Sequence, residues 1–91
     1  MSEKFINIGN KNFTNVNKIK HISAVDSDKV RRFLKKHNLD RTSMQVTDAT
    51  GDKEVRSMLL LDDDSVTLSS VSSVALSKRA SAYMETEDNE E

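Results

Sequence analysis

Two lysines that lie two positions apart, Lys18 and Lys20, are the residues whose type and spacing first suggest chemistry in this chain. They fall in a stretch of strand-like composition, and alternate residues of a strand point to the same face of the sheet. Both ammonium groups would then lie together. Such a pair suits contact with phosphate, because each neutralised phosphate releases counterions. The spacing therefore indicates a surface that contacts phosphate groups.

The formal net charge of −1 at pH 7 hides an uneven distribution of charge along the 91 residues. Five carboxylates fall in the last seven residues, and without them 14 basic residues stand against the other 10 acidic ones. A basic body with an acidic tail is a hint of nucleic-acid binding, although ordinary solvated surfaces also carry charge. The tail would either keep the protein in solution or compete for the basic face.

The sequence contains no catalytic constellation. Two glycines, Gly9 and Gly51, cannot build a glycine-rich phosphate loop. His21 shares a strand face with Ile19 and Val25, and no acid or nucleophile is spaced to work with it, so we expect a packed or half-buried side chain. The absence of cysteine excludes a thiolate zinc site and fits a reducing cytoplasm. We therefore expect a cytoplasmic protein that is not an enzyme and needs no cofactor.

The stretch 48–70 predicts a β-hairpin around which the rest of the chain is arranged. Residues 54–61 are mostly apolar, and residues 65–70 alternate apolar with polar side chains. Three consecutive aspartates at 62–64 separate these runs. Aspartates favour turns because their side chains hydrogen-bond nearby backbone amides. They could also form half of a metal site, but no calcium-loop spacing follows them, so we expect a turn and no metal.

Four further strand-like segments accompany this hairpin. A first strand is predicted over 5–9, where apolar and polar residues alternate before a glycine, and a second over 13–16. A third strand over 18–25 carries the two lysines. A fourth over 43–47 alternates Met44 and Val46 with polar residues. The predicted sheet is therefore small and mainly antiparallel, with the hairpin at its centre.

A helix is predicted from a cap at Asp26 or Ser27 to about Asn38. Its apolar face is formed by Val30, Phe33, Leu34 and His37. Its opposite face carries Arg31, Arg32, Lys35 and Lys36. That basic face could contact nucleic acid, or it could be an ordinary solvated helix surface.

A second helix is predicted after a cap at Ser72 or Ser73, with one face formed by Leu76, Ala80, Tyr83 and Met84. We expect this helix to fray where the acidic tail, residues 85–91, begins. The tail has nothing to bury and is expected to be disordered. The chain is thus a single α+β domain over 1–84. No apolar run approaches the length of a membrane helix, and residues 1–20 are too polar for a signal peptide.

Several short motifs follow one another in an order that resembles the RemA family of small bacterial regulators. The matching residues are Ile6-Asn7-Ile8-Gly9, Asn12, Asn17-Lys18-Ile19, Val30-Arg31-Arg32, Asp48-Ala49-Thr50, Arg56, the segment from Asp62 to Ser69, and Arg79. Each motif is a weak signal by itself, and their joint order makes the resemblance specific. It extends roughly from residue 4 to residue 80, which is nearly the whole domain.

The resemblance implies a DNA-binding transcriptional regulator of biofilm-matrix genes. Members of the RemA family form ring-shaped homo-oligomers whose rim gathers basic side chains that bend or wrap DNA. For this chain the resemblance implies a ring-like homo-oligomer, with double-stranded DNA and further copies of itself as partners.

Five cations are the candidate DNA contacts. Lys18 matches the basic residue of the family's Asn-Arg-Ile segment and keeps its charge without the bidentate fork of arginine. Lys53 and Glu54 match an adjacent basic pair of the family, so half of that pair is retained, and Glu54 would repel phosphate. In order of preference the candidates are Lys18, Lys53 and Arg56, followed by Lys20 and Lys11.

A protein-interaction module is the alternative function. The domain would then keep the family fold and bind a protein partner, or co-assemble with a related regulator and weaken its DNA binding through Glu54 and the acidic tail. The salt dependence of binding distinguishes the two functions. Binding of DNA by lysines weakens steeply as salt rises, whereas a mainly apolar protein interface does not.

Overall fold

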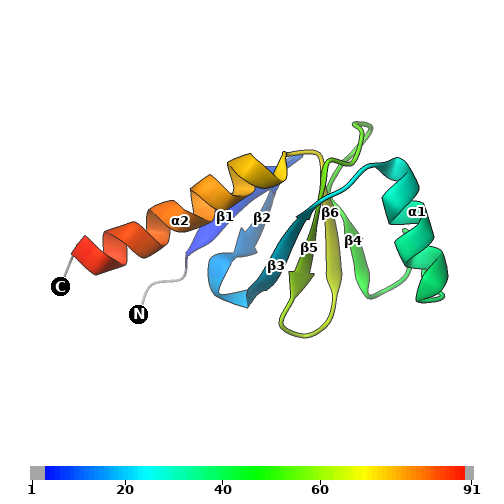
Figure 1. Cartoon of the computed structure of the whole chain (residues 1–91), viewed down its shortest axis with the longest axis horizontal. Helices are drawn as coiled ribbons and strands as arrows, with labels where there is room; N and C mark the ends of the chain where they lie inside the picture. The colour runs from blue at the N-terminus through cyan, green and yellow to red at the C-terminus, as the bar shows by residue number, and fades with distance from the viewer. Residues whose placement is uncertain (1–3, 90–91) are drawn as a thin grey trace.

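A four-stranded sheet with the strand order β3-β5-β6-β4 forms the centre of the molecule (Figure 1). The computed structural model describes residues 4–89. The strands of this sheet are β3 (Ile19–Ala24), β4 (Val46–Asp48), β5 (Ser57–Leu61) and β6 (Val66–Ser69). The predicted hairpin is confirmed as the antiparallel pair β5-β6, which occupies the middle of the sheet. β4 pairs with β6 in parallel, so the sheet is mixed.

The turn between β5 and β6 is built by the three aspartates, as predicted. The Asp63 carboxylate accepts a hydrogen bond from the Ser65 amide at 3.0 Å. Asp64 adopts a left-handed backbone conformation with φ 69°, which aspartate tolerates better than most residues. The Asp63 carboxylate thus stabilises the local turn by accepting a hydrogen bond from a turn amide.

One face of the central sheet is covered by helix α1 (Ser27–Lys36). Val30 and Leu34 of this helix are buried against Val66 and Leu68 of β6. The Asp26 side chain caps the helix by accepting a hydrogen bond from the Lys29 amide at 2.8 Å. The predicted helix is confirmed, and so is its apolar face at Val30, Phe33 and Leu34, because apolar residues at a spacing of three and four lie along one side of a helix. The prediction was wrong for His37, which is exposed because the helix ends at Lys36.

The opposite face of the sheet is covered by a two-stranded ribbon, β1 (Phe5–Gly9) with β2 (Asn12–Asn15), and by helix α2 (Ser73–Asn89). Ile6 and Ile8 of β1 join Leu59 of β5 and Leu76 of α2 in a second buried cluster. The neighbours of Leu59 in β5, Met58 and Leu60, point to the other face and pack against the α1 cluster. Strand β5 therefore contributes to both buried clusters. The α+β class with two helices is therefore confirmed.

Helix α2 begins beside the sheet and extends away from it, so that its C-terminal end and α1 lie at opposite ends of the molecule (Figure 1). The Ser72 hydroxyl accepts a hydrogen bond from the Ala75 amide at 3.2 Å and caps the helix. The helical backbone continues to Asn89, past the point where the sequence predicted fraying. The predicted disorder of the acidic tail stays a prediction, and residues 90 and 91 lie outside the described part. Within residues 4–89, no helix combines the length and apolar character that a membrane crossing requires.

Two strand predictions were wrong in detail. Met44 was placed in a strand, but β4 begins only at Val46 and the Met44 side chain is 99% exposed. The segment before β4 instead forms turns, in which the Ser43 hydroxyl accepts a hydrogen bond from the Asp40 amide at 3.0 Å. The alternation of apolar and polar residues over 43–47 therefore did not mark a strand. The backbone there makes its hydrogen bonds within a local turn instead.

The faces predicted for the third strand were also wrong. Lys18 is the last residue of a short 3-10 helix, η1 (Val16–Lys18), and the pairing of β3 with β5 shifts by one residue between Ile19 and His21. This bulge puts Ile19 and Ile22 on the same buried side. His21 is consequently exposed and not packed. A β-bulge adds one unpaired residue and reverses the alternation beyond it.

Candidate nucleic-acid interface

The five candidate cations are all exposed, but the structure divides them between two ends of the central sheet. Strands β3 and β5 are antiparallel, with Ile19 opposite Leu61 and Ala24 opposite Ser57. Residues just before β3 and residues just before β5 therefore lie at opposite ends, roughly 17 Å apart for about five residues at ~3.3 Å each. We call the end that carries Lys18 and Lys20 the turn end, and the end that carries Lys11, Lys53 and Arg56 the loop end.

At the turn end, the two lysines lie beside the aspartates of the β5-β6 turn. The Lys20 ammonium forms an ion pair with the Asp64 carboxylate, with Nζ 3.3 Å from Oδ1. The Lys18 carbonyl accepts a hydrogen bond from the Asp62 amide at 2.8 Å. Hydrogen bonds from Ser65 hold the pKa of Asp63 below its ordinary value, and the charge of Lys18 adds to this effect. The lysines here are offset by carboxylates that repel phosphate.

At the loop end, two turns from distant parts of the sequence lie side by side. A Cβ atom built on Gly51 would lie 2.9 Å from Nδ2 of Asn10, so the β4-β5 loop touches the β1-β2 turn. An open hollow of ≈ 570 Å³ lies between them, and its lining includes Asn10, Lys53 and Arg56. Lys11 is the neighbour of Asn10 in the same turn. The structure therefore brings Lys53 and Arg56 together at one hollow and places Lys11 in the adjoining turn at the same end of the sheet.

The backbone of the β4-β5 loop is anchored to the sheet on both sides of Arg56. The Arg56 amide donates to the Ser69 carbonyl at 2.8 Å, and its carbonyl accepts from the Val25 amide at 3.1 Å. The Lys53 amide donates to the Thr50 carbonyl at 3.1 Å within a tight turn. Both side chains remain exposed. A fixed backbone with free side chains limits the entropy that is lost when the cations are ordered on a ligand.

The start of the same loop is held by the Asp48 carboxylate. Asp48 Oδ1 accepts hydrogen bonds from the Thr50 amide at 3.0 Å and from the Thr50 hydroxyl at 2.5 Å, while Oδ2 faces Arg41 at 3.3 Å. Partial burial would raise the pKa of Asp48, but the Thr50 hydrogen bonds and the Arg41 charge outweigh it and keep that pKa below its ordinary value. The ionised form of Asp48 therefore positions the loop that carries Lys53.

Lys11 occupies an unusual backbone conformation at the tip of the β1-β2 turn. Asn10 and Lys11 are the two central residues of this turn, with φ values of 51° and 61°. Two-residue turns of this kind favour Asn followed by Gly, because both central residues have positive φ. A lysine at the second position costs about 1 kcal/mol relative to an unstrained conformation. This strained position presents a cation next to the β4-β5 loop.

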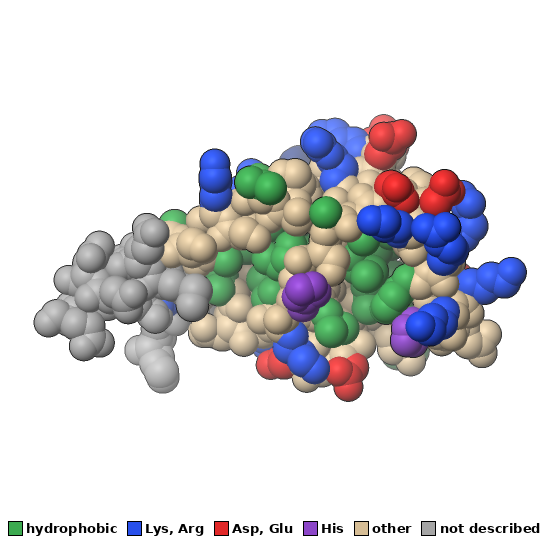
Figure 2. All heavy atoms as spheres, viewed as in Figure 1, with side chains coloured by type: hydrophobic (Ala, Val, Ile, Leu, Met, Phe, Trp, Pro, Cys, Tyr) green, Lys and Arg blue, Asp and Glu red, His purple; other side chains and the backbone are tan. Residues whose placement is uncertain are grey.

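The loop end also carries two acidic residues. Asp52 and Glu54 flank Lys53 in the lining of the hollow, so the three cations are offset by two carboxylates. Figure 2 shows basic and acidic side chains mixed over the β4-β5 loop at the upper edge and over α1 beside it. The loop end keeps an excess of one positive charge, whereas the turn end, with three aspartates against two lysines, has an excess of one negative charge.

Sequence reasoning did not identify Asn10 as part of the site. Its side chain lies against Gly51, 41 positions further along the chain, and fixes how the two turns meet. Turn composition indicated its local role, but no sequence pattern relates two turns that are so far apart. The basic face predicted for the first helix is exposed as expected, and Arg31 there pairs with Asp28 at 3.2 Å.

The sequence matches the RemA-like family, described as Extracellular matrix regulatory protein A-like, over residues 5–80. The chain belongs to the RemA-like family. Two Geobacillus proteins, from strain WCH70 and from G. kaustophilus, are each 34% identical over 79 residues, which is 87% of both chains. A protein of Carboxydothermus hydrogenoformans is 31% identical over 89 residues, 98% of this chain and 99% of its own. All three bear the name "Putative regulatory protein". The predicted family is confirmed.

Proposed function

We propose that this RemA-like chain is a DNA-binding transcriptional regulator that acts as a homo-oligomer in the bacterial cytoplasm. The observation that supports DNA binding best is the loop end, where Lys53 and Arg56 line one hollow on an anchored loop and Lys11 lies in the adjoining turn. Phosphate contacts from these cations would give affinity and position, while sequence preference would come from DNA shape and bending. No catalytic role and no cofactor are part of this proposal.

A single copy offers too few cations to hold DNA firmly, because each loop end has an excess of only one positive charge. Repetition in a ring-like homo-oligomer changes this. Once one copy is bound, the contacts of its neighbours become effectively intramolecular, so weak contacts add up to a large affinity. Lys18 and Lys20 at the turn end form a second, weaker set of contacts in this proposal.

The alternative, a protein-interaction module, is supported by one observation. Asp52 and Glu54 flank Lys53, and three aspartates lie beside Lys18 and Lys20, so both ends of the sheet carry carboxylates that repel phosphate. Such mixed surfaces suit a protein partner with complementary charges.

A mobility-shift titration on a long duplex at low and at physiological salt tests the proposed function. The wild type should bind, and binding should weaken steeply with salt. A loop-end variant, Lys11→Ala with Lys53→Ala and Arg56→Ala, should lose most of the affinity. Each phosphate contact that is removed should make the negative slope of log K against log salt shallower by about 0.9. Light scattering should show that the variant keeps the wild-type mass.

Two matched variants serve as controls. Lys29→Ala with Arg32→Ala and Lys36→Ala removes three exposed cations of α1 and should change DNA binding little. Lys18→Ala with Lys20→Ala should have an intermediate effect, since carboxylates already offset these lysines. An intact wild-type oligomer that ignores DNA at both salts would contradict the proposed function and favour the protein-interaction module.

A further inference from the structure

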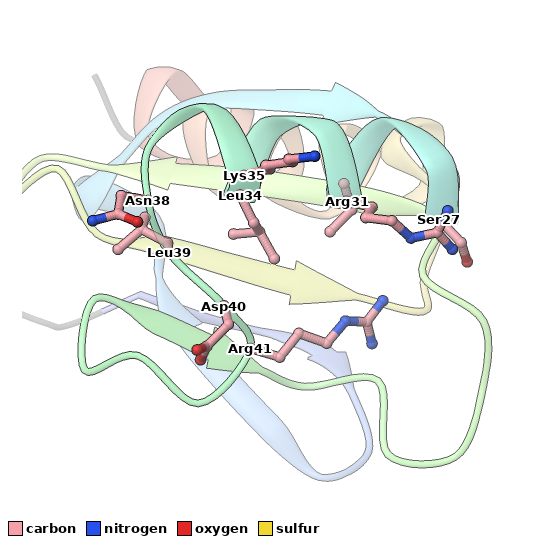
Figure 3. Close-up of a pocket in the computed structure, with 9 residues that line it drawn as sticks. Ser27, Arg31, Leu34, Lys35, Asn38, Leu39, Asp40 and Arg41 are labelled. Atoms are coloured by element: carbon pink, nitrogen blue, oxygen red, sulfur yellow. The ribbon is translucent and has the colours of Figure 1, made fainter.

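A groove between α1 and the segment that follows it has no part in the proposed DNA contacts (Figure 3). Its volume is ≈ 530 Å³, and it is lined by one side of α1 and by residues 38–41. Leu34 points from the helix toward the facing segment, and Leu39 adds a second apolar side chain. Arg31, Lys35 and Arg41 stand around these leucines. The groove thus combines an apolar floor with a basic rim.

Two of the three cations on the rim already form ion pairs on the exposed surface, Arg31 with Asp28 at 3.2 Å and Arg41 with Asp48 at 3.3 Å. The one acidic residue in the lining, Asp40, accepts hydrogen bonds from the Thr42 hydroxyl at 2.5 Å and the Thr42 amide at 2.8 Å, and these bonds lower its pKa and so favour its ionised form. In Figure 3 the Asp40 carboxylate points away from Arg31 and Arg41, which extend in a common direction. Lys35 forms no ion pair with any residue in the described part of the chain. Exposed ion pairs contribute little free energy, so Arg31 and Arg41 can exchange their present partners for an incoming carboxylate, and Lys35 can bind one directly. The groove therefore fits an acidic segment that also carries apolar side chains.

We propose that this groove binds the acidic C-terminal segment, residues 85–91, of a second copy of the chain. That segment carries five carboxylates in seven residues and directly follows Tyr83 and Met84. Its composition is complementary both to the basic rim and to the apolar floor. The inference rests on the self-assembly that is part of the proposed function, and it names the two surfaces that meet.

The position of α2 excludes the same copy as the source of the segment. α1 and the C-terminal end of α2 lie at opposite ends of a molecule whose longest dimension is 45 Å (Figure 1). The two residues that follow Asn89 span at most about 7 Å when extended. The segment would reach the groove of its own copy only if α2 unwound. A neighbouring copy satisfies the same contact with α2 intact.

This contact joins two different surfaces, so it is heterologous. Head-to-tail contacts of this type close into rings when the rotation between copies allows it, and otherwise continue as filaments. Charge contacts on exposed surfaces are screened over a Debye length of about 10 Å at 0.1 M salt. The assembly should therefore loosen as salt rises.

Charge reversal tests the proposal, with mass measured by light scattering at low salt and without DNA. The groove variant, Arg31→Glu with Lys35→Glu, and the tail variant, Glu85→Lys with Glu87→Lys and Asp88→Lys, should each fall from a multiple of 10.3 kDa toward the mass of one chain. Mixing the two variants should restore the assembly, because each supplies the surface that the other needs. Combining all five substitutions in one chain should restore it as well.

Reassembly of the mixture shows that each variant lost only the contact and kept its fold, because opposite charge on a partner could not refold a misfolded chain. A matched control, Arg32→Glu with Lys36→Glu, reverses two exposed cations of α1 that do not line the groove and should keep the wild-type mass. A wild type that stays a single chain, a groove variant that keeps the wild-type mass, or a mixture that fails to reassemble would each overturn the proposal.

Deleting residues 85–91 distinguishes two possible roles of the tail: binding to the groove of a neighbouring copy, or covering the DNA-binding cations. If the tail binds a neighbouring copy, the deletion should reduce the mass of the assembly. It should also weaken DNA binding, because fewer linked copies contact the duplex. A deletion that tightens DNA binding and leaves the mass unchanged would mean that the tail covers cations of the loop end, and would overturn the proposal. Failure of the proposed function is distinct, since it would leave charge-dependent assembly in a protein that does not bind DNA.

Discussion

Lys11 places a cation at the loop end but lowers the stability of the fold. It occupies a position with φ 61° where glycine is favoured. Lys11→Gly should raise the free energy of unfolding by about 0.5–1 kcal/mol, because the strain is relieved, and should weaken DNA binding, because a cation is lost. Denaturant unfolding and mobility shifts measure the two effects.

The matched control at the same position is Lys11→Ala. Alanine removes the cation but keeps the strain, so DNA binding should weaken without any gain in stability. A glycine variant that binds DNA as well as the wild type would show that Lys11 is not a contact.

Asp48 makes stability depend on pH at the scale of a single residue. Its pKa is lowered in the folded state, so the ionised carboxylate contributes stability above its unfolded pKa of about 4, and this contribution is lost as pH falls through the folded pKa. Asp48→Asn should lower the free energy of unfolding by about 1 kcal/mol at pH 7. The difference from wild type should shrink toward pH 3. Urea titrations at the two pH values test this, and an unchanged difference would contradict it.

At the scale of elements, α2 is held to the sheet by its first turns. Leu76 is completely buried against Ile6, Ile8 and Leu59, while Val74, two residues earlier, is 64% exposed. Leu76→Ala should therefore lower the free energy of unfolding by about 2–5 kcal/mol, because it removes packed methyl groups and leaves a cavity. Val74→Ala, the matched control, should cost much less. Equal losses in thermal unfolding would mean that α2 does not dock through Leu76.

At the scale of the whole molecule, the antiparallel pairing of β3 with β5 decides which cations can act together. It sends Lys18 and Lys20 to the aspartate turn and leaves Lys53 and Arg56 at the opposite end, beside Lys11. The molecule thus has two separate charged ends, and the groove of α1 adjoins the loop end through the ion pair of Arg41 with Asp48. In the proposed function a long duplex would contact one of these ends along a row of copies, so DNA affinity should depend on assembly more than on the strength of any one contact.

Much of the fold was accessible from periodicity and turn chemistry. Apolar spacing in Val30 and Leu34 predicted the buried face of α1, and the aspartates at 62–64 predicted the turn of the central hairpin. These are local signals, since a few adjacent residues determine them. The bulge in β3 and the turn around Met44 were missed, because a one-residue shift in pairing and a competing local hydrogen bond leave no mark in the pattern of apolar residues.

The sequence by itself determined the family, the two helices, the central hairpin and a set of exposed cations, because each of these depends on residue type and on spacing over a few positions. Only the tertiary structure decided which cations meet. Lys53 lies beside the Lys11 turn because Asn10 packs against Gly51, and Lys20 is paired with Asp64 because β3 runs antiparallel to β5. Electrostatic interactions depend on distance in space, and chain separations of about 40 residues do not specify that distance until the strands are paired.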